Sequence, residues 1–131
     1  MFLHMLNDDQ KRAFAALALK LTAADGAVVG REAAKLRALA GEMNLELEGW
    51  DSNASIAELA ASFTDRRSKV VALLELLGFA HSDTSFQAVE EKMVNEMASA
   101  MNVSGDDLKR LETWVGQHVD HVREAFALMR E

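Results

Sequence analysis

The sequence repeats itself at an offset of 58 residues, which indicates a fold built from two related halves. Asp25 is followed seven residues later by Glu32, and Asp83 is followed at the same spacing by Glu90. The same offset aligns Ala40 with Ala98, and Met43-Asn44-Leu45 with Met101-Asn102-Val103. The sequence therefore predicts a duplicated unit with an acidic pair at the same point in each copy.

The repeated unit is predicted to be helical. Proline is absent and seven glycines lie mostly at the edges of periodic segments, as expected of an all-α chain, because helix interiors disfavour both residues. Alternation of β-branched residues, the mark of strands, is nearly absent. We expect a single compact all-α domain over residues 1–131, with about five to seven helices and half-repeats at about 10–50 and 68–110. A chain of this length can bury one core.

Apolar periodicity and capping residues place the helices. We expect Asn7 to cap the first helix with Gln10 at the capping-box position, Thr64 to cap the fourth and Ser104 to cap the last. Asp51-Ser52-Asn53 offers caps for the third, and Gly116 is a point at which the last helix can bend. The predicted ranges are 8–24, 30–44, 54–63, 65–81, 86–102 and 105 to the chain end.

Two sets of apolar residues indicate the core. Residues 70–80 are apolar on nearly all sides, which predicts a central, largely buried helix. Methionines recur at helical spacing with Leu and Val, and we expect them to fill the core. These are Met43, Met93, Met97, Met101 and Met129. Trp50 and Trp114 are expected to anchor the core or its rim, whereas an exposed pair would indicate a partner surface.

Charge and cysteine content exclude several classes of function. The net charge of −7 disfavours nucleic acid and anionic membrane surfaces, which need clustered Lys and Arg. The absence of cysteine excludes disulfides, thiolate catalysis and zinc–sulfur sites. The first residues lack a basic signal-peptide region, and no apolar run is long enough to span a membrane. We expect a cytoplasmic protein with no nucleic-acid partner and no membrane insertion.

The acidic pairs are the candidate site. Four carboxylates from Asp25, Glu32, Asp83 and Glu90 would suit a hard cation such as Ca²⁺ or Mg²⁺ better than Zn²⁺. The competing interpretation is that these residues only stabilise turns and helix starts. Thr84 stands where the first copy has Gly26, and a β-branched residue disfavours a left-handed turn, which puts the second half-site in doubt.

These residues resemble the tellurite-resistance TerB-like family. Its members are compact all-α domains of two related halves, each with an Ala-Asp-Gly-type turn and a Glu seven residues after the Asp. Ala24-Asp25-Gly26 with Glu32 fits that pattern, and Ser82-Asp83-Thr84 with Glu90 fits it less well. The resemblance covers roughly residues 10–115. It implies a role in stress or tellurite resistance, with divalent cations bound by the acidic residues.

Other candidate sites carry less weight. Counted from Asp25, the first turn lacks the EF-hand ligands, because Leu36 stands where Glu is required, and no Glu-x-x-His segment supports a di-iron bundle. His118 and His121 could bind a transition metal, or could simply lie on a polar helix face. Glu75 interrupts the most apolar helix. It either reaches solvent or a basic residue at the helix edge, or faces the acidic site.

We therefore expect a non-enzymatic TerB-like binding module with a candidate divalent-cation site. The alternative is a helical scaffold that recruits a protein partner and uses the carboxylates only as caps. A metal-dependent hydrolase ranks third. A protein partner of unknown identity is expected, and a homodimer is compatible with the sequence.

Overall fold

The computed structural model describes residues 2–22, 37–38, 40–43, 54–81 and 88–130. Their regular secondary structure is entirely helical, which confirms the predicted all-α class with five to seven helices. Residues 40–43 are also helical. The named elements are a 3-10 helix η1 (Leu3–Met5) and the α-helices α1 (Asp8–Thr22), α3 (Ile56–Ala60), α4 (Arg66–His81), α5 (Ala88–Ala100) and α6 (Gly105–Met129).

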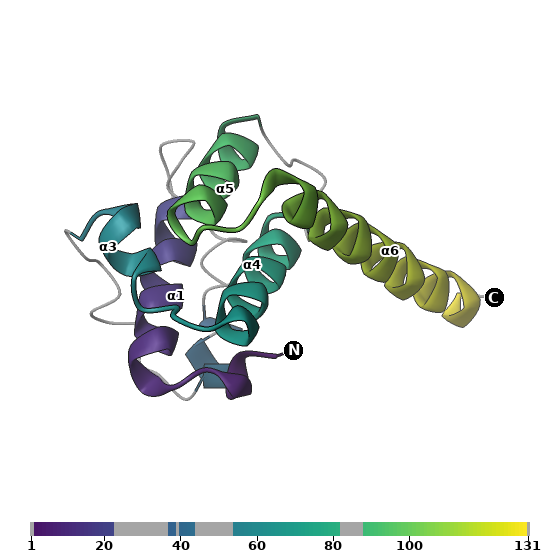
Figure 1. Ribbon diagram of the computed structural model, residues 1–131. Helices are drawn as coiled ribbons and strands as arrows, with labels where there is room; N and C mark the ends of the chain where they lie inside the picture. The colour runs from purple at the N-terminus through teal and green to yellow at the C-terminus, as the bar shows by residue number, and fades with distance from the viewer. Residues whose placement is uncertain (1, 23–36, 39, 44–53, 82–87, 131) are drawn as a thin grey trace.

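Helix α4 lies at the centre of the fold, in contact with η1, α1, α5 and α6 (Figure 1). Leu73, Leu76 and Leu77 are fully buried, because neighbouring helices cover α4 on several sides. The prediction of a central buried helix is therefore confirmed. A helix that is apolar almost all round cannot remain at a surface, so its neighbours must pack around it.

Helix α1 begins with the predicted capping box. The backbone N–H of Gln10 donates to Asn7 Oδ1 (2.8 Å), and the backbone N–H of Asn7 donates to Gln10 Oε1 (3.0 Å). The Gln10 side chain is nearly buried, and its Nε2 also donates to the Ser62 carbonyl oxygen (3.2 Å). Gln10 thus ties the start of α1 to the segment that follows α3.

Helix α4 is capped by Asp65, and the prediction of Thr64 is wrong by one residue. Asp65 Oδ1 accepts the backbone N–H of Ser68 (3.0 Å), and the Ser68 hydroxyl donates to the Asp65 carbonyl oxygen (3.1 Å). Hydrogen bonding by Ser68, through its side chain and then its backbone N–H, lowers the pKa of Asp65 below its usual value. Asp65 also carries its charge at the positive end of the helix dipole, where Thr64 would supply none.

The two caps are equivalent under the 58-residue offset. Asn7 corresponds to Asp65 and Gln10 to Ser68, and Gln10 and Ser68 are both buried polar residues. The later part of the repeat behaves in the same way: the aligned pairs Ala40 and Ala98, and Met43 and Met101, are all buried. Burial and capping therefore recur at the spacing that the sequence pattern indicates.

A tight reversal joins α5 to α6. Asn102 adopts a left-handed conformation (φ 62°), the backbone N–H of Val103 donates to the Ala98 carbonyl oxygen (2.9 Å), and that of Asn102 donates to Ser99 (3.0 Å). This is a Schellman helix end, in which asparagine tolerates the left-handed position. Ser104 then caps α6 as predicted, since its Oγ accepts the Asp107 backbone N–H (3.1 Å).

Ser55 caps α3 by accepting the Glu58 backbone N–H (3.1 Å), whereas the predicted caps at residues 51–53 lie outside the described residues. Helix α6 is one continuous α-helix that passes through Gly116. Its second half extends away from the other helices (Figure 1), and residues 120–130 are all exposed. None of the described helices is both long and apolar enough to cross a membrane.

Replacing Asn7 tests the cap of α1. Asn7→Ala removes the acceptor for the Gln10 N–H, and we expect a loss of about 1 kcal/mol in the free energy of unfolding, or a Tm about 4 °C lower. Asn7→Asp keeps an acceptor at the same place and is expected to retain nearly all of the stability. Thermal melts of both variants provide the measurement, and equal melting of Asn7→Ala and wild type would contradict the capping role.

Candidate interaction groove

The predicted acidic site falls mostly outside the described part of the chain. Asp25, Glu32 and Asp83 lie outside the described residues, and Glu90 lies in α5 without a described side chain. Whether the two acidic pairs converge therefore stays a prediction. Within the described part, no group of three or more imidazole or carboxylate side chains could hold a metal ion, and this part includes His118 and His121.

Glu75 binds the N-terminal segment of the chain. Its side chain is half-buried on α4, and its Oε1 accepts the backbone N–H of Phe2 at 2.6 Å. A hydrogen bond to an ionised carboxylate is shorter and stronger than one between neutral groups. Glu75 thereby holds Phe2 and η1 beside α4. The sequence pattern marked Glu75 as unusual, but periodicity gave no sign that its partner is a backbone N–H 73 residues away.

Beside Glu75 an apolar groove opens between α4, the N-terminal segment and α6. Its volume is about 430 Å³, within the range typical of ligand and peptide pockets. Phe2, Leu74 and Gly78 line one side. The α6 side is lined by Trp114, Val115, His118, Val119, Val122, Arg123 and Phe126. Glu75, His118 and Arg123 are the ionisable residues among its lining, and the others are apolar, aromatic or glycine, so the groove suits an apolar occupant with few polar groups.

Three rings form one edge of the groove. The His118 imidazole stacks on the Trp114 indole with a centroid separation of 5.3 Å and an interplanar angle of 4°. The Phe2 ring lies on Trp114 at 6.2 Å, tilted by 51°. Trp114 remains 43% exposed, so it is a rim residue and not part of the core. Trp50 lies outside the described residues.

The floor of the groove continues along α6 as an apolar stripe, which we define as Leu108, Val115, Val119, Val122, Phe126 and Met129. These residues recur every three, four or seven positions and so occupy one face of the helix. Leu108 and Val115 are buried against the other helices, whereas Val122 is 42% exposed, Phe126 59% and Met129 74%. The same face is therefore covered in the first half of α6 and uncovered in the second.

The exposure of Met129 corrects one expectation. Met43, Met97 and Met101 are buried core residues and Met93 packs at the edge of the core, as predicted. Met129 is at the right helical spacing for a core residue, but α6 has by then left the other helices. Periodicity identifies the face of a helix and does not tell where that face loses its neighbours.

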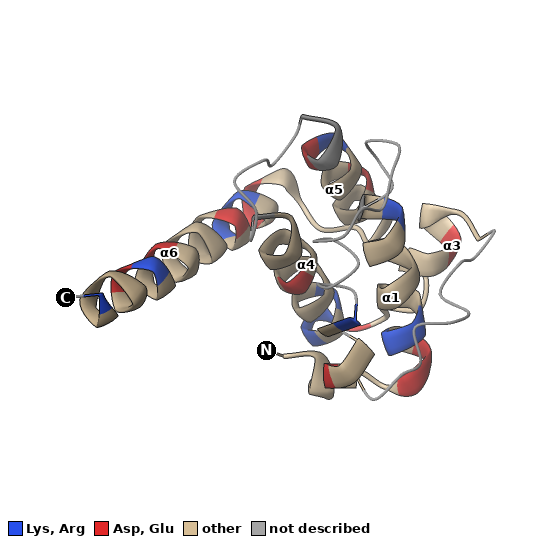
Figure 2. Cartoon of the chain, turned by 180° about the vertical axis from the view of Figure 1, so that it is seen from behind, with Lys and Arg blue, Asp and Glu red and all other residues tan. Residues whose placement is uncertain are grey.

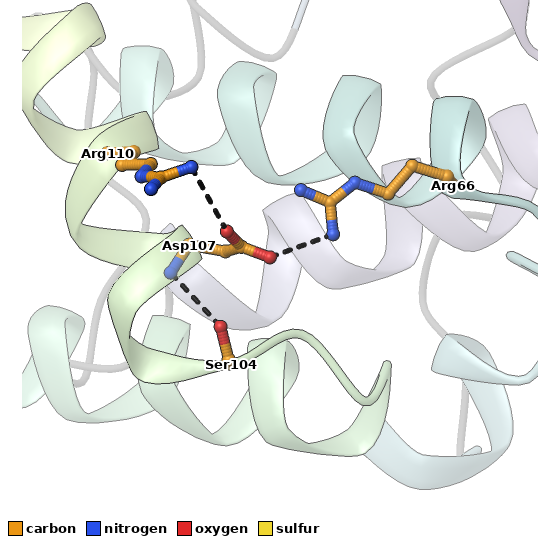
Figure 3. Close-up of polar contacts among 4 residues, drawn as sticks. All are labelled: Arg66, Ser104, Asp107 and Arg110. Carbon is orange, nitrogen blue, oxygen red and sulfur yellow. Dashed lines mark hydrogen bonds and ion pairs between the residues drawn. The ribbon is translucent and has the colours of Figure 1, made fainter.

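Polar contacts fix the first turn of α6 against the start of α4 (Figure 3). Asp107 Oδ2 accepts from Arg66 Nη1 at 3.0 Å, and Arg110 Nη1 lies 4.0 Å from Asp107 Oδ1. Both arginines are exposed, and such surface pairs contribute at most about 1 kcal/mol. The contacts of Asp107 therefore help to orient the N-terminal end of α6. Burial of Leu108 and Val115 contributes most of the stability of its packing against the other helices.

Comparison of the chain with protein-family models, with curated proteins and with solved structures found no match.

Val115 and Val122 lie on the same apolar stripe, and replacing each with alanine tests how far along α6 the other helices cover that stripe. Val115→Ala removes two buried methyl groups and is expected to lower the free energy of unfolding by about 2 kcal/mol. Val122→Ala makes the same chemical change at a position that is uncovered in the single chain, and in dilute solution, where the chain is monomeric, it should cost less than about 0.5 kcal/mol. Denaturant titrations of the two variants would measure the difference. Equal losses would show that Val122 is as well packed as Val115.

Proposed function

We propose that this protein is a non-enzymatic helical interaction module whose groove binds the apolar face of a partner helix. The observation that carries the proposal is the uncovered half of the apolar stripe, which adjoins a groove of about 430 Å³. Contiguous exposed apolar surface is uncommon on soluble monomers and marks interaction sites. An amphipathic helix in an apolar groove is a recurrent mode of protein recognition, in which side chains at i, i+3 or i+4 act as anchors.

The composition of the groove and of the adjoining exposed stripe supports a protein partner more than a small polar substrate. Trp114, Phe126 and Met129 supply large apolar contact areas, and aromatic residues and methionine are enriched at protein interfaces. Arg123 lines the groove beside them and offers hydrogen bonds at the rim. This surface corresponds to the scaffold alternative drawn from the sequence. It assigns no role to the acidic pairs.

Site-specific photo-crosslinking in cells that produce the protein tests this function. A photoreactive amino acid at Val122 should yield adducts with another polypeptide, and these should disappear when Phe126→Asp is added. The same group at Glu124 provides the control, because two residues along a helix turn the side chain by about 200°, away from the stripe. Adducts that form equally from Glu124, or that persist with Phe126→Asp, would contradict the proposal.

A second candidate function is the binding of a divalent cation in a stress or tellurite-resistance setting, as the TerB-like resemblance implies. The recurrence of caps and buried positions at the 58-residue offset favours it, because the paired acidic motif depends on the same repeat. Under this proposal Asp25 and Glu32 are oxygen ligands, and Asp83 and Glu90 form a second pair. Ca²⁺ or Mg²⁺ fits carboxylates better than Zn²⁺ does.

Thermal melts of chelator-treated protein, with and without added cation, test this second candidate function. Cation at a hundred times its dissociation constant should stabilise the protein by about 2.7 kcal/mol, a rise in Tm on the order of 10 °C. Asp25→Ala should abolish the rise. If Ca²⁺, Mg²⁺, Mn²⁺ and Zn²⁺ all leave Tm unchanged, the carboxylates act only at turns and helix starts.

A further inference from the structure

We infer that the occupant of the groove is the exposed half of α6 from a second copy of this chain, in an antiparallel twofold dimer. This inference rests on the proposed function, since it names the partner of the same surface. Each chain carries both parts of such an interface next to each other: an exposed apolar helix face and an apolar groove. Phe126 and Met129 project from the stripe as apolar anchors, and the groove beside Phe2 and Leu74 can receive them.

The spacing along α6 makes this arrangement self-complementary. Phe126 lies eight residues beyond His118, or about 12 Å along the helix axis. An antiparallel pair centred on Val122 therefore places Phe126 of each chain opposite His118 of the other, about one helical turn from Trp114. Each protruding end then enters the groove of its partner. Such an isologous contact closes on itself at two copies, as twofold symmetry requires.

Charge also favours a second copy at this surface. The chain carries a net charge of −7, so most faces of two copies repel each other. Residues 114–130 contain two acidic residues, Asp120 and Glu124, and two basic ones, Arg123 and Arg130, so this stretch is neutral with histidine uncharged. The groove adds one acidic residue, Glu75, whose Oε1 accepts the Phe2 backbone N–H. Both signs alternate along the helix (Figure 2). Asp120 and Glu124 lie two residues from Val122, about 200° around the helix, and so face away from the stripe.

The exposed apolar area matches what a dimer of this kind needs. Trp114 is 43% exposed, Val122 42%, Phe126 59% and Met129 74%. Together with their half-buried neighbours in the groove they present roughly 500 Å² of apolar surface, given 150–250 Å² for each large aromatic side chain. Interfaces are about 60% apolar, so this corresponds to roughly 800 Å² per partner. A standard stable interface buries about that area.

The test measures the mass of the whole protein in solution over a range of concentrations. Light scattering coupled to size exclusion should give twice the chain mass of 14.4 kDa. Phe126→Asp should weaken dimerisation at least tenfold with Tm in dilute solution unchanged. Leu128→Asp is the matched control: Leu128 is 81% exposed on the same helix but lies about 200° around the helix from Phe126, so this variant should remain dimeric.

Single cysteines then test the geometry, because the natural chain contains none. Val122→Cys lies at the twofold axis and should form an interchain disulfide on mild oxidation. Met129→Cys should not, since the two copies of residue 129 would be about 21 Å apart. Crosslinking through both positions would overturn the antiparallel arrangement.

A mass of 14.4 kDa at every concentration would overturn the dimer altogether. The proposed function as an interaction module would still hold if a photoreactive group at Val122 crosslinked to a different protein and Phe126→Asp abolished that crosslink. A monomer without such adducts would remove both proposals.

Discussion

Helix α4 is buried at the centre of the fold, and most of the other described elements pack so as to cover it. Its sequence offers almost no polar face, so α4 is stable only when other elements surround it. Helices α1, α5 and α6 and the short η1 supply that cover. Glu75, the acidic residue within the apolar run, is tolerated because the backbone N–H of Phe2 bonds to it at the edge of the packed region. The contact of the N-terminal segment with α4 thus also places Phe2 in the lining of the groove.

The same packing explains why α6 carries an uncovered apolar face. One stripe runs the length of α6, but α4 is only 16 residues long and covers only the first part of it. Beyond Val119, which still packs against the core, the helix leaves the other elements while its pattern continues through Val122, Phe126 and Met129. Exposing such a face costs free energy in water, and pairing with another apolar helix removes that cost. The groove and the protruding stripe are therefore parts of a single surface.

Sequence reasoning predicted the all-α class and the caps of α1 and α6, but not the groove. Helical periodicity, the absence of proline and the reciprocal Asn7–Gln10 pattern predicted the all-α fold and the start of α1, because these signals act over three or four residues. The cap of α4 was misplaced by one residue, since Thr64 and Asp65 are both good caps and only the backbone decides between them. Phe2, Leu74 and Trp114 come from three distant segments that share no local pattern. The acidic pairs lie at or beyond the limits of the described residues.

Under the proposed dimer, the second half of α6 becomes buried by pairing with a second copy. Hydrogen exchange of the backbone amides of residues 118–129, measured at several protein concentrations, tests this most directly. If the dimer forms, exchange of these amides slows as concentration rises, while the amides of α4 remain equally protected throughout. If the amides of residues 118–129 exchange at the same rate at every concentration, the exposed face does not pair with a second copy and the claim is contradicted.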